Sequence, residues 1–194
     1  MKKIMKILQA IAMISMVTST LNAYEAMYEK TRVDKIEIKT ISERTALEAS
    51  TQGNYFRGNN GLFRRLFRYI SDEEVEMTVP VEADVNPGKM RFFVGKEDRH
   101  KSLSSKEGVK VVTMPKLTVV SIGIRGSYSE DRFRKNEKKL LEWLKKQKKY
   151  EKAGSAYAVY WNGPFVPGIF KRSEVHVPIR KKPKKKENRT QPDK

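Results

Sequence analysis

The segment GLFRRLFRYISDEEVEMTVPV, residues 61–81, contains both kinds of apolar spacing that decide the fold. In its first half, apolar residues recur at intervals of three and four, which places one stripe of a helix against a core; they are Leu62, Phe63, Leu66, Phe67 and Ile70. In its second half, residues 75–81 are rich in β-branched side chains, as a half-buried strand requires. The segment therefore predicts a helix followed directly by a strand.

The same two patterns extend outward from this segment. Further strands are predicted wherever β-branched and aromatic residues recur with period two, at residues 33–41, 44–49, 90–94, 109–113, 117–125, 156–161 and 174–179. A second helix is predicted over residues 129–149, with Ser129 at its N-terminus and Leu140, Leu141 and Leu144 on its buried side. Strand, strand, helix, strand, strand thus occurs twice. We predict an α+β domain of two similar halves that pack sheet against sheet, with a helix on each.

Composition limits the classes of function. A chain of 194 residues suits one domain with tails. Its net charge is +18, from 41 Lys and Arg against 23 Asp and Glu, so its surface should attract anionic partners. It contains no cysteine, which excludes disulfides, thiolate zinc sites and cysteine nucleophiles.

Residues 1–23 have the order of a secretory signal peptide. Lys2, Lys3 and Lys6 precede an apolar run over residues 7–17, and Ala23 is a small residue at a suitable cleavage position. The alternative, an uncleaved membrane anchor, is disfavoured because the run is shorter than the roughly 20 residues that span a bilayer. We predict export to the periplasm or the extracellular space, with a mature domain over residues 24–179.

The C-terminal sequence RKKPKKKENRTQPDK, residues 180–194, has no apolar residue other than its prolines. It predicts a disordered basic tail, because nothing in it could be buried to offset the entropy of ordering. Such a tail could hold the protein at an anionic membrane, although a merely solvated surface is about equally plausible. Nucleic acid is an unlikely partner for an exported chain.

Three segments in order resemble one known family. Residues 61–70 resemble the first helix of the SOUL haem-binding family, VEMTVPV at residues 75–81 resembles its MT-x-PV strand, and YAVYWNGPFVPGIFKRSEVHVPI at residues 157–179 resembles its closing block. The resemblance implies a distorted eight-stranded antiparallel β-barrel with two flanking helices, built from a duplicated half. It also implies non-covalent binding of haem or a related tetrapyrrole, a flat apolar ligand.

Two departures from the family pattern affect the expected site. The connection between the first helix and the MT-x-PV strand, residues 71–74, is short and acidic, whereas the family usually has a glycine and an asparagine there. Some family members also ligate iron through a histidine before the first helix, and no histidine occurs in that region here. Any bound haem is therefore expected to lack an axial histidine.

Aromatic and methionine side chains are the candidates for the walls of a tetrapyrrole pocket; they are Phe63, Phe67, Met77, Phe93, Tyr128, Trp161 and Phe165. Arg64, Arg65 and Arg68 could pair with propionates. For the apolar residues the alternative is ordinary core packing, and for the arginines it is a solvated helix face.

Other chemistry has weaker support in the sequence. His100 lies in a polar loop and His176 in a strand, and a lone histidine is weak evidence for a metal ligand, so no metal site is predicted. Glu76 and Glu174 could act as general bases if the chain were a small-molecule hydrolase or isomerase of the wider GyrI-like superfamily. A strand carboxylate is more often an ion-pair partner, and no G-x-S-x-G or phosphate-loop motif is present. The sequence therefore predicts a binding protein rather than an enzyme.

Overall fold

The computed structural model describes residues 24–57, 61–163 and 165–183. The predicted signal peptide and most of the predicted tail lie outside these residues, so both remain predictions. No helix in the described part of the chain is long and apolar enough to cross a membrane.

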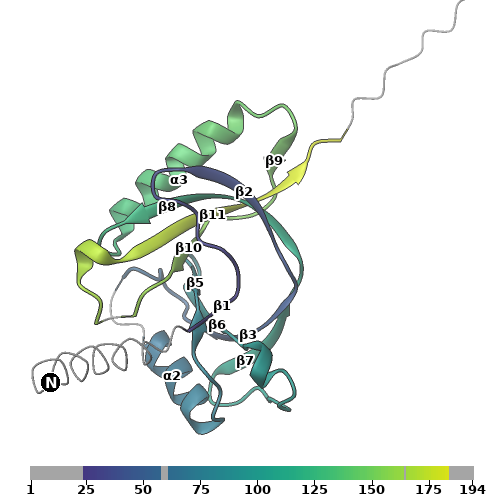
Figure 1. Cartoon of the computed structure of the whole chain (residues 1–194), viewed down its shortest axis with the longest axis vertical. Coiled ribbons are helices and arrows are strands. Elements are labelled where there is room, and N and C mark those ends of the chain that lie inside the picture. Colours follow the sequence, from purple (N-terminus) through teal and green to yellow (C-terminus); the bar gives the residue numbers. More distant parts are fainter. Residues whose placement is uncertain (1–23, 58–60, 164, 184–194) are drawn as a thin grey trace, which may run out of the picture.

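The described chain has two halves with the same order of elements (Figure 1). After the short strand β1 (Glu25–Ala26), the first half consists of β2 (Ile36–Ile41), β3 (Arg44–Ser50), α2 (Leu62–Asp72), β4 (Thr78–Val79), β5 (Val81–Asp84) and β6 (Lys89–Phe93). The second half consists of β7 (Val109–Met114), β8 (Leu117–Arg125), α3 (Glu130–Lys145), β9 (Tyr150–Lys152), β10 (Tyr157–Tyr160) and β11 (Arg172–Lys181). Short 3-10 turns, η1 (Lys96–Asp98) and η2 (Gly168–Phe170), lie in the connections.

The main sheet is antiparallel, with the order β2-β8-β11-β10-β5-β6-β3-β7, and β9 pairs with the far end of β11. Exchanging each strand for its counterpart in the other half reverses this order, so the halves are related by an approximate twofold axis between β5 and β10.

The sheet is open, and the closed barrel implied by the resemblance is not formed by the described strands. β2 and β3 together pair with β8 and β7 in one continuous register, with Ile41 opposite Leu117 and Arg44 opposite Met114. In the order of the described strands, β2 pairs only with β8 and β7 pairs only with β3, so the two ends of the order have no further partner.

The helices cover one face of the sheet and leave its centre free. α2 packs mainly on β3, β6 and β7, whereas α3 packs mainly on β8, β9 and β11. Leu66 of α2 and Leu140 of α3 are fully buried. The central strands β5 and β10 therefore lie between the helices. The opposite face of the sheet curves around the N-terminal segment, residues 24–35 (Figure 1).

The N-terminal segment reaches the sheet at Gly123 of β8. The backbone N–H of Asp34 donates to the Gly123 carbonyl over 2.9 Å, and Val33 forms a parallel bridge with the same residue. A Cβ atom on Gly123 would lie 2.4 Å from the Arg32 carbonyl oxygen and 2.5 Å from that of Thr31. A residue without a side chain is therefore required for this close approach.

Several boundaries differ from those the sequence predicts, and three of the differences have a clear physical cause. The predicted strand over residues 75–81 is divided into β4 and β5 at Pro80, which cannot donate a ladder hydrogen bond. α3 ends at Lys145 instead of residue 149, because the chain then turns to form β9. β11 continues through Lys181, past the predicted end of the domain at residue 179, because backbone pairing with β9 does not require apolar side chains.

The contact at Gly123 can be tested by substitution. Gly123→Ala should lower the free energy of unfolding by about 1–3 kcal/mol, because the added methyl group meets backbone that cannot move aside cheaply. Urea denaturation measures this change. Gly53→Ala is the matched control, since a Cβ atom there meets nothing within 4 Å. Equal stability of the two variants would contradict the close approach.

Candidate functional site

A cavity of about 520 Å³ lies beside the central strands, in the gap between the helices. β5 contributes Val81 and β10 contributes Tyr160, which is its Cα partner across the sheet. α2 and the loop between β10 and β11 form other walls, and the full set of lining residues is Tyr24, Tyr55, Phe63, Phe67, Met77, Val79, Val81, Met90, Tyr128, Tyr160, Trp161, Asn162, Gly163, Phe165 and Lys171. The lining is mostly aromatic, and the volume of the cavity is in the range usual for small-molecule sites.

Most of the apolar residues singled out from the sequence meet at this cavity: Phe63, Phe67, Met77, Tyr128, Trp161 and Phe165. Phe93 does not. It is buried on the opposite face of the sheet, with its ring 4.6 Å from the Arg44 guanidinium. Its neighbour Phe92 faces α2 instead and packs edge-on against Phe63. Successive strand residues face opposite ways, and the sequence alone did not show which phenylalanine faced the helix.

The arginines of α2 are not among the residues that line the cavity. Arg64 and Arg68 are exposed, and Arg65 points toward the Ser50 carbonyl oxygen at 3.4 Å. The charged side chain in the lining is Lys171, whose Nζ lies 5.0 Å from the centre of the Tyr128 ring. Lys171 follows the loop that closes the cavity, and no helical or strand periodicity in the sequence points to it.

Three tyrosine side chains of the lining, those of Tyr55, Tyr128 and Tyr160, remain neutral over the physiological range. Burial raises the pKa of Tyr55 and of Tyr128 to about 12, and it raises the pKa of Tyr160 well above 10. The Tyr128 hydroxyl lies 3.1 Å from the carbonyl oxygens of Asn162 and Arg172, which fixes its ring at the cavity wall. The walls therefore offer aromatic faces and little charge.

Trp161 connects the cavity to a buried polar network on the opposite face of the sheet. Its ring lines the cavity, whereas its indole Nε1–H donates to Oε1 of Glu174 over 2.7 Å. The same oxygen accepts from the backbone N–H of Thr31, also over 2.7 Å. Glu174 is only 1% exposed.

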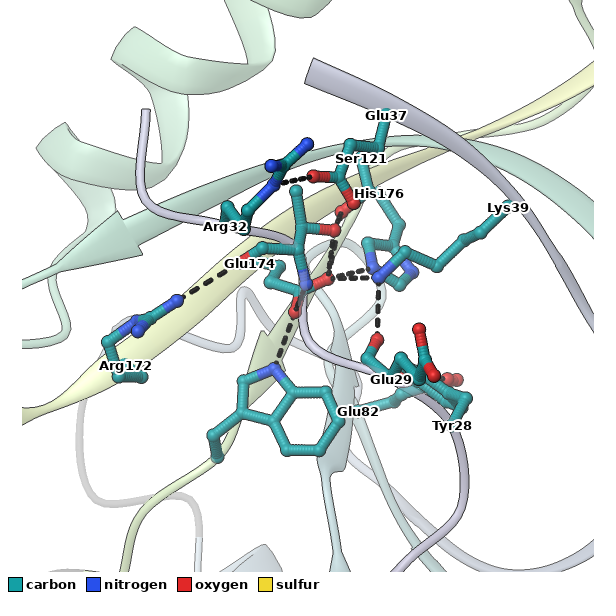
Figure 2. A network of polar contacts seen from close by, with 12 residues as sticks. Tyr28, Glu29, Arg32, Glu37, Lys39, Glu82, Ser121, Arg172, Glu174 and His176 are labelled. Carbon is teal, nitrogen blue, oxygen red and sulfur yellow. Dashed lines mark hydrogen bonds and ion pairs between the residues drawn. The ribbon is translucent and has the colours of Figure 1, made fainter. Parts of the chain in front are cut away.

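The second oxygen of Glu174 accepts four further hydrogen bonds (Figure 2). The donors are Thr31 Oγ1 at 3.0 Å, Lys39 Nζ at 3.0 Å, Ser121 Oγ at 2.8 Å and His176 Nε2 at 2.7 Å. Burial on its own would raise the pKa of the carboxyl group, but the contacts with His176, Lys39 and Ser121 outweigh it and lower the pKa well below 4.5. Glu174 is therefore an anion whose oxygens are already occupied by donors.

The two histidines stand apart from the cavity. His176 is fully buried, and its Nδ1 lies 3.0 Å from the Tyr157 hydroxyl, so both ring nitrogens are engaged within the protein. Because the Glu174 carboxylate can only accept, Nε2 carries the proton in this arrangement. His100 is exposed beyond η1. Neither residue lines the cavity.

Glu82 forms a second buried acidic centre on the same face as Glu174. It accepts from Arg44 over 2.7 Å and from the Tyr28 hydroxyl over 2.9 Å. The ring of Tyr28 in turn packs edge-on against Trp161. The N-terminal segment thus places Tyr28 on one buried carboxylate and Thr31 on the other. Little in the sequence signalled these roles, because Glu82 directly follows the strand predicted over residues 75–81 and Glu174 is the first residue of the strand predicted over residues 174–179.

Neither glutamate considered as a general base is placed to act on a ligand in the cavity. Glu174 is inaccessible, and its lowered pKa makes it a weak base. Glu76 is exposed and absent from the lining, and its backbone N–H donates to Asp98. Among the residues described, no group of three or more His, Asp or Glu side chains could hold a metal ion.

The network around Glu174 should contribute strongly to stability. Glu174→Gln replaces an acceptor oxygen with an amide that faces other donors, so the free energy of unfolding should fall by roughly 3 kcal/mol. Glu151→Gln is the control, because its ion pair with Arg180 is exposed and should change stability by less than about 0.5 kcal/mol. Urea denaturation at pH 7 measures the free energy of unfolding of both variants. Equal losses in the two would show that the network does not stabilise the fold.

Acid should weaken the same network. In the unfolded chain Glu174 regains a pKa near 4.5, so its contribution is complete above that pH and declines as the pH falls toward the lower folded-state pKa. The stability difference between wild type and Glu174→Gln should therefore shrink by roughly 2 kcal/mol from pH 6 to pH 3, at 1.36 kcal/mol per pH unit. A constant difference across urea titrations in this range would refute the lowered pKa.

Comparisons with known proteins agree with this fold. The C-terminal domain of EcmrR superposes with a TM-score of 0.61 and 14% identity, over 76% of this chain and 98% of that one. The structure of EcmrR in its complex with DNA also gives a TM-score of 0.61 at 14% identity, over 92% of this chain and 69% of that one. A conserved protein from Listeria innocua gives a TM-score of 0.50 at 14% identity, over 77% of this chain and 94% of that one.

At such low identity these structures share the fold alone with the present chain. No curated protein matches it in sequence. The family model described as SOUL heme-binding protein, however, matches residues 22–178, which include both halves of the fold and the complete cavity lining. The chain therefore belongs to the SOUL heme-binding protein family.

Proposed function

We propose that this protein binds haem or another tetrapyrrole non-covalently in the aromatic cavity between its two helices. The observation that carries the proposal is the lining itself, in which aromatic faces from α2, the central strands and the loop before β11 surround one space of about 520 Å³. Family membership supports the same class of ligand. Catalysis is not part of the proposal, because no carboxylate or histidine is found in the lining as described.

The shape and chemistry of the walls suit a flat ring. Phe63 and Phe67 are stacked with an angle of 13° between their planes, and the rings of Tyr128 and Tyr160 lie 4.4 Å apart. Aromatic faces of this kind bind flat apolar ligands by offset stacking. Lys171 supplies one cation that could pair with a propionate at the cavity edge.

The lining provides poor ligands for iron. It contains no histidine in the part of the chain that is described, and the raised pKa values of Tyr55, Tyr128 and Tyr160 disfavour a phenolate. The thioethers of Met77 and Met90 are the remaining soft donors. A bound haem would supply redox chemistry, but we infer that the protein recognises the macrocycle more than the metal.

We further propose that the protein acts outside the cytoplasm, as the signal-peptide pattern of residues 1–23 predicts. An apolar ligand that is carried across an aqueous compartment needs an enclosed site, which supports a carrier or scavenger function.

Recognition of the ring can be separated from recognition of the iron. Hemin and metal-free protoporphyrin should bind with similar affinity, measured by absorbance and by quenching of tryptophan fluorescence, because Trp161 lines the cavity. The hemin spectrum should lack the signature of histidine ligation. Binding of hemin alone, or no binding of either, would contradict the proposal.

Two substitutions should locate the ligand. Phe67→Ala should weaken porphyrin binding by about tenfold, because stacking area is lost, whereas Ile38→Ala on β2 removes a similarly exposed side chain outside the cavity and should have no effect. Lys171→Gln should weaken binding of the porphyrin diacid by about tenfold, because a charge-assisted hydrogen bond is lost.

The dimethyl ester of the porphyrin provides the internal control for Lys171. It cannot form the ionic contact, so its affinity should be the same in wild type and in Lys171→Gln. Equal losses for diacid and ester would mean that Lys171 acts through packing and does not pair with a propionate.

A further inference from the structure

Exposed apolar side chains gather at the entrance to the cavity. The loop between β10 and β11 exposes Phe165 to 98%, Ile169 to 71% and Phe170 to 58%. Tyr24, Phe67 and Phe63 are also exposed, to 56%, 51% and 38%, and they line the same cavity as Phe165. Among the large exposed apolar residues of the described chain, Ile38 on β2, which is 40% exposed, is the one that belongs neither to this loop nor to the cavity lining. Apolar patches of this kind usually mark interaction sites.

The loop that exposes these side chains is held in place by its own backbone. The Phe170 N–H donates to the Pro167 carbonyl over 2.9 Å, and the Lys171 N–H donates to that of Gly168 over 3.1 Å. The Gly126 N–H then donates to the Lys171 carbonyl, which ties the loop to the end of β8. The loop therefore presents Ile169 and Phe170 from a hydrogen-bonded turn, and both residues leave most of their surface in contact with solvent.

Cationic residues are neighbours of several residues that line the cavity. Lys171 directly follows the exposed loop and lines the cavity. Arg64 and Arg68 are exposed on α2 next to Phe63 and Phe67. The exposed Lys30 has its Nζ 5.0 Å from the centre of the Trp161 ring, and the whole chain carries a net charge of +18.

We propose that this entrance, formed by Phe63, Phe67, Phe165, Ile169 and Phe170 with the flanking cations, docks onto an anionic phospholipid membrane. The apolar side chains enter the interfacial region, and the lysine and arginine side chains contact lipid phosphates. The charge complementarity favours a lipid surface over a second copy of the chain, because two copies would bring like charges together. Docking in this manner would open the cavity toward the membrane, but it does not depend on which ligand the cavity holds.

The absence of cysteine allows a direct test of insertion. Ile169→Cys and Ile38→Cys, each labelled in the full chain with an environment-sensitive nitrobenzoxadiazole dye, place one probe inside the proposed surface and one outside it. With vesicles of phosphatidylcholine and phosphatidylglycerol, the probe at residue 169 should shift to the blue and be quenched by nitroxide-labelled lipid. The probe at residue 38 should do neither. Identical responses of the two probes would overturn the proposal.

A second measurement uses vesicle co-sedimentation. The triple variant Phe165→Ser, Ile169→Ser, Phe170→Ser should bind the same vesicles at least ~100-fold more weakly than wild type, at about tenfold for each apolar side chain withdrawn from lipid. Residues 1–23 and the basic tail are unchanged, so they contribute equally to both proteins. Raising the salt concentration should weaken binding of wild type only in part, because the apolar contribution is not screened.

Unchanged vesicle binding by the triple variant would overturn the proposal and assign attachment to charge alone. Sedimentation velocity without lipid distinguishes the remaining occupant. If wild type is a dimer that the triple variant converts to a monomer, and vesicle binding is unaffected, the surface is an interface between copies. Far-ultraviolet circular dichroism of the variant checks that the fold is retained.

Discussion

The buried carboxylate of Glu174 is the contact on which the arrangement of this protein depends. A charge taken out of water costs several kcal/mol unless its oxygens are hydrogen-bonded, and here donors come from the N-terminal segment, β2, β8, β11 and Trp161, which directly follows β10. Because each donor must be in place, one side chain determines how these separate parts of the chain sit together. It also orients the Trp161 ring, which becomes a wall of the cavity.

The internal symmetry explains why a cavity forms at this position. α2 packs mainly on β3, β6 and β7, and α3 packs mainly on β8, β9 and β11, so the two central strands, β5 and β10, lie between the areas that the helices cover. Alternate side chains of these strands point to the helix side, where Val81 and Tyr160 meet as cross-strand partners. A gap at the twofold axis is thus a consequence of packing two helices on one sheet, and its lining is apolar because the strands continue the core pattern.

The sheet also separates two chemical environments. Its concave face holds the buried carboxylates of Glu174 and Glu82, which accept hydrogen bonds from donors within the chain. Its helix face holds a cavity with neutral walls and one lysine. Charged groups that could perform proton transfer are thus on the side that a ligand in the cavity does not reach, whereas the ligand would meet surfaces suited to binding. This division is the structural basis of the binding function that we propose.

The sequence by itself determined the α+β class and, apart from β1 and β9, the order of elements in both halves, because periodicity of three to four or of two reports which local structure can bury apolar side chains. It also singled out five aromatic residues that lie in the cavity lining, Phe63, Phe67, Tyr128, Trp161 and Phe165. The tertiary structure decided that the sheet stays open and that Phe92, not Phe93, faces α2. It also decided that Lys171 replaces the arginines at the cavity, and that Tyr28 and Thr31 satisfy the two buried glutamates. These contacts join residues far apart in the chain, up to 143 positions for Thr31 and Glu174. Local spacing carries no information about such partners, since the register between distant strands and the path of the N-terminal segment arise only when the chain has folded.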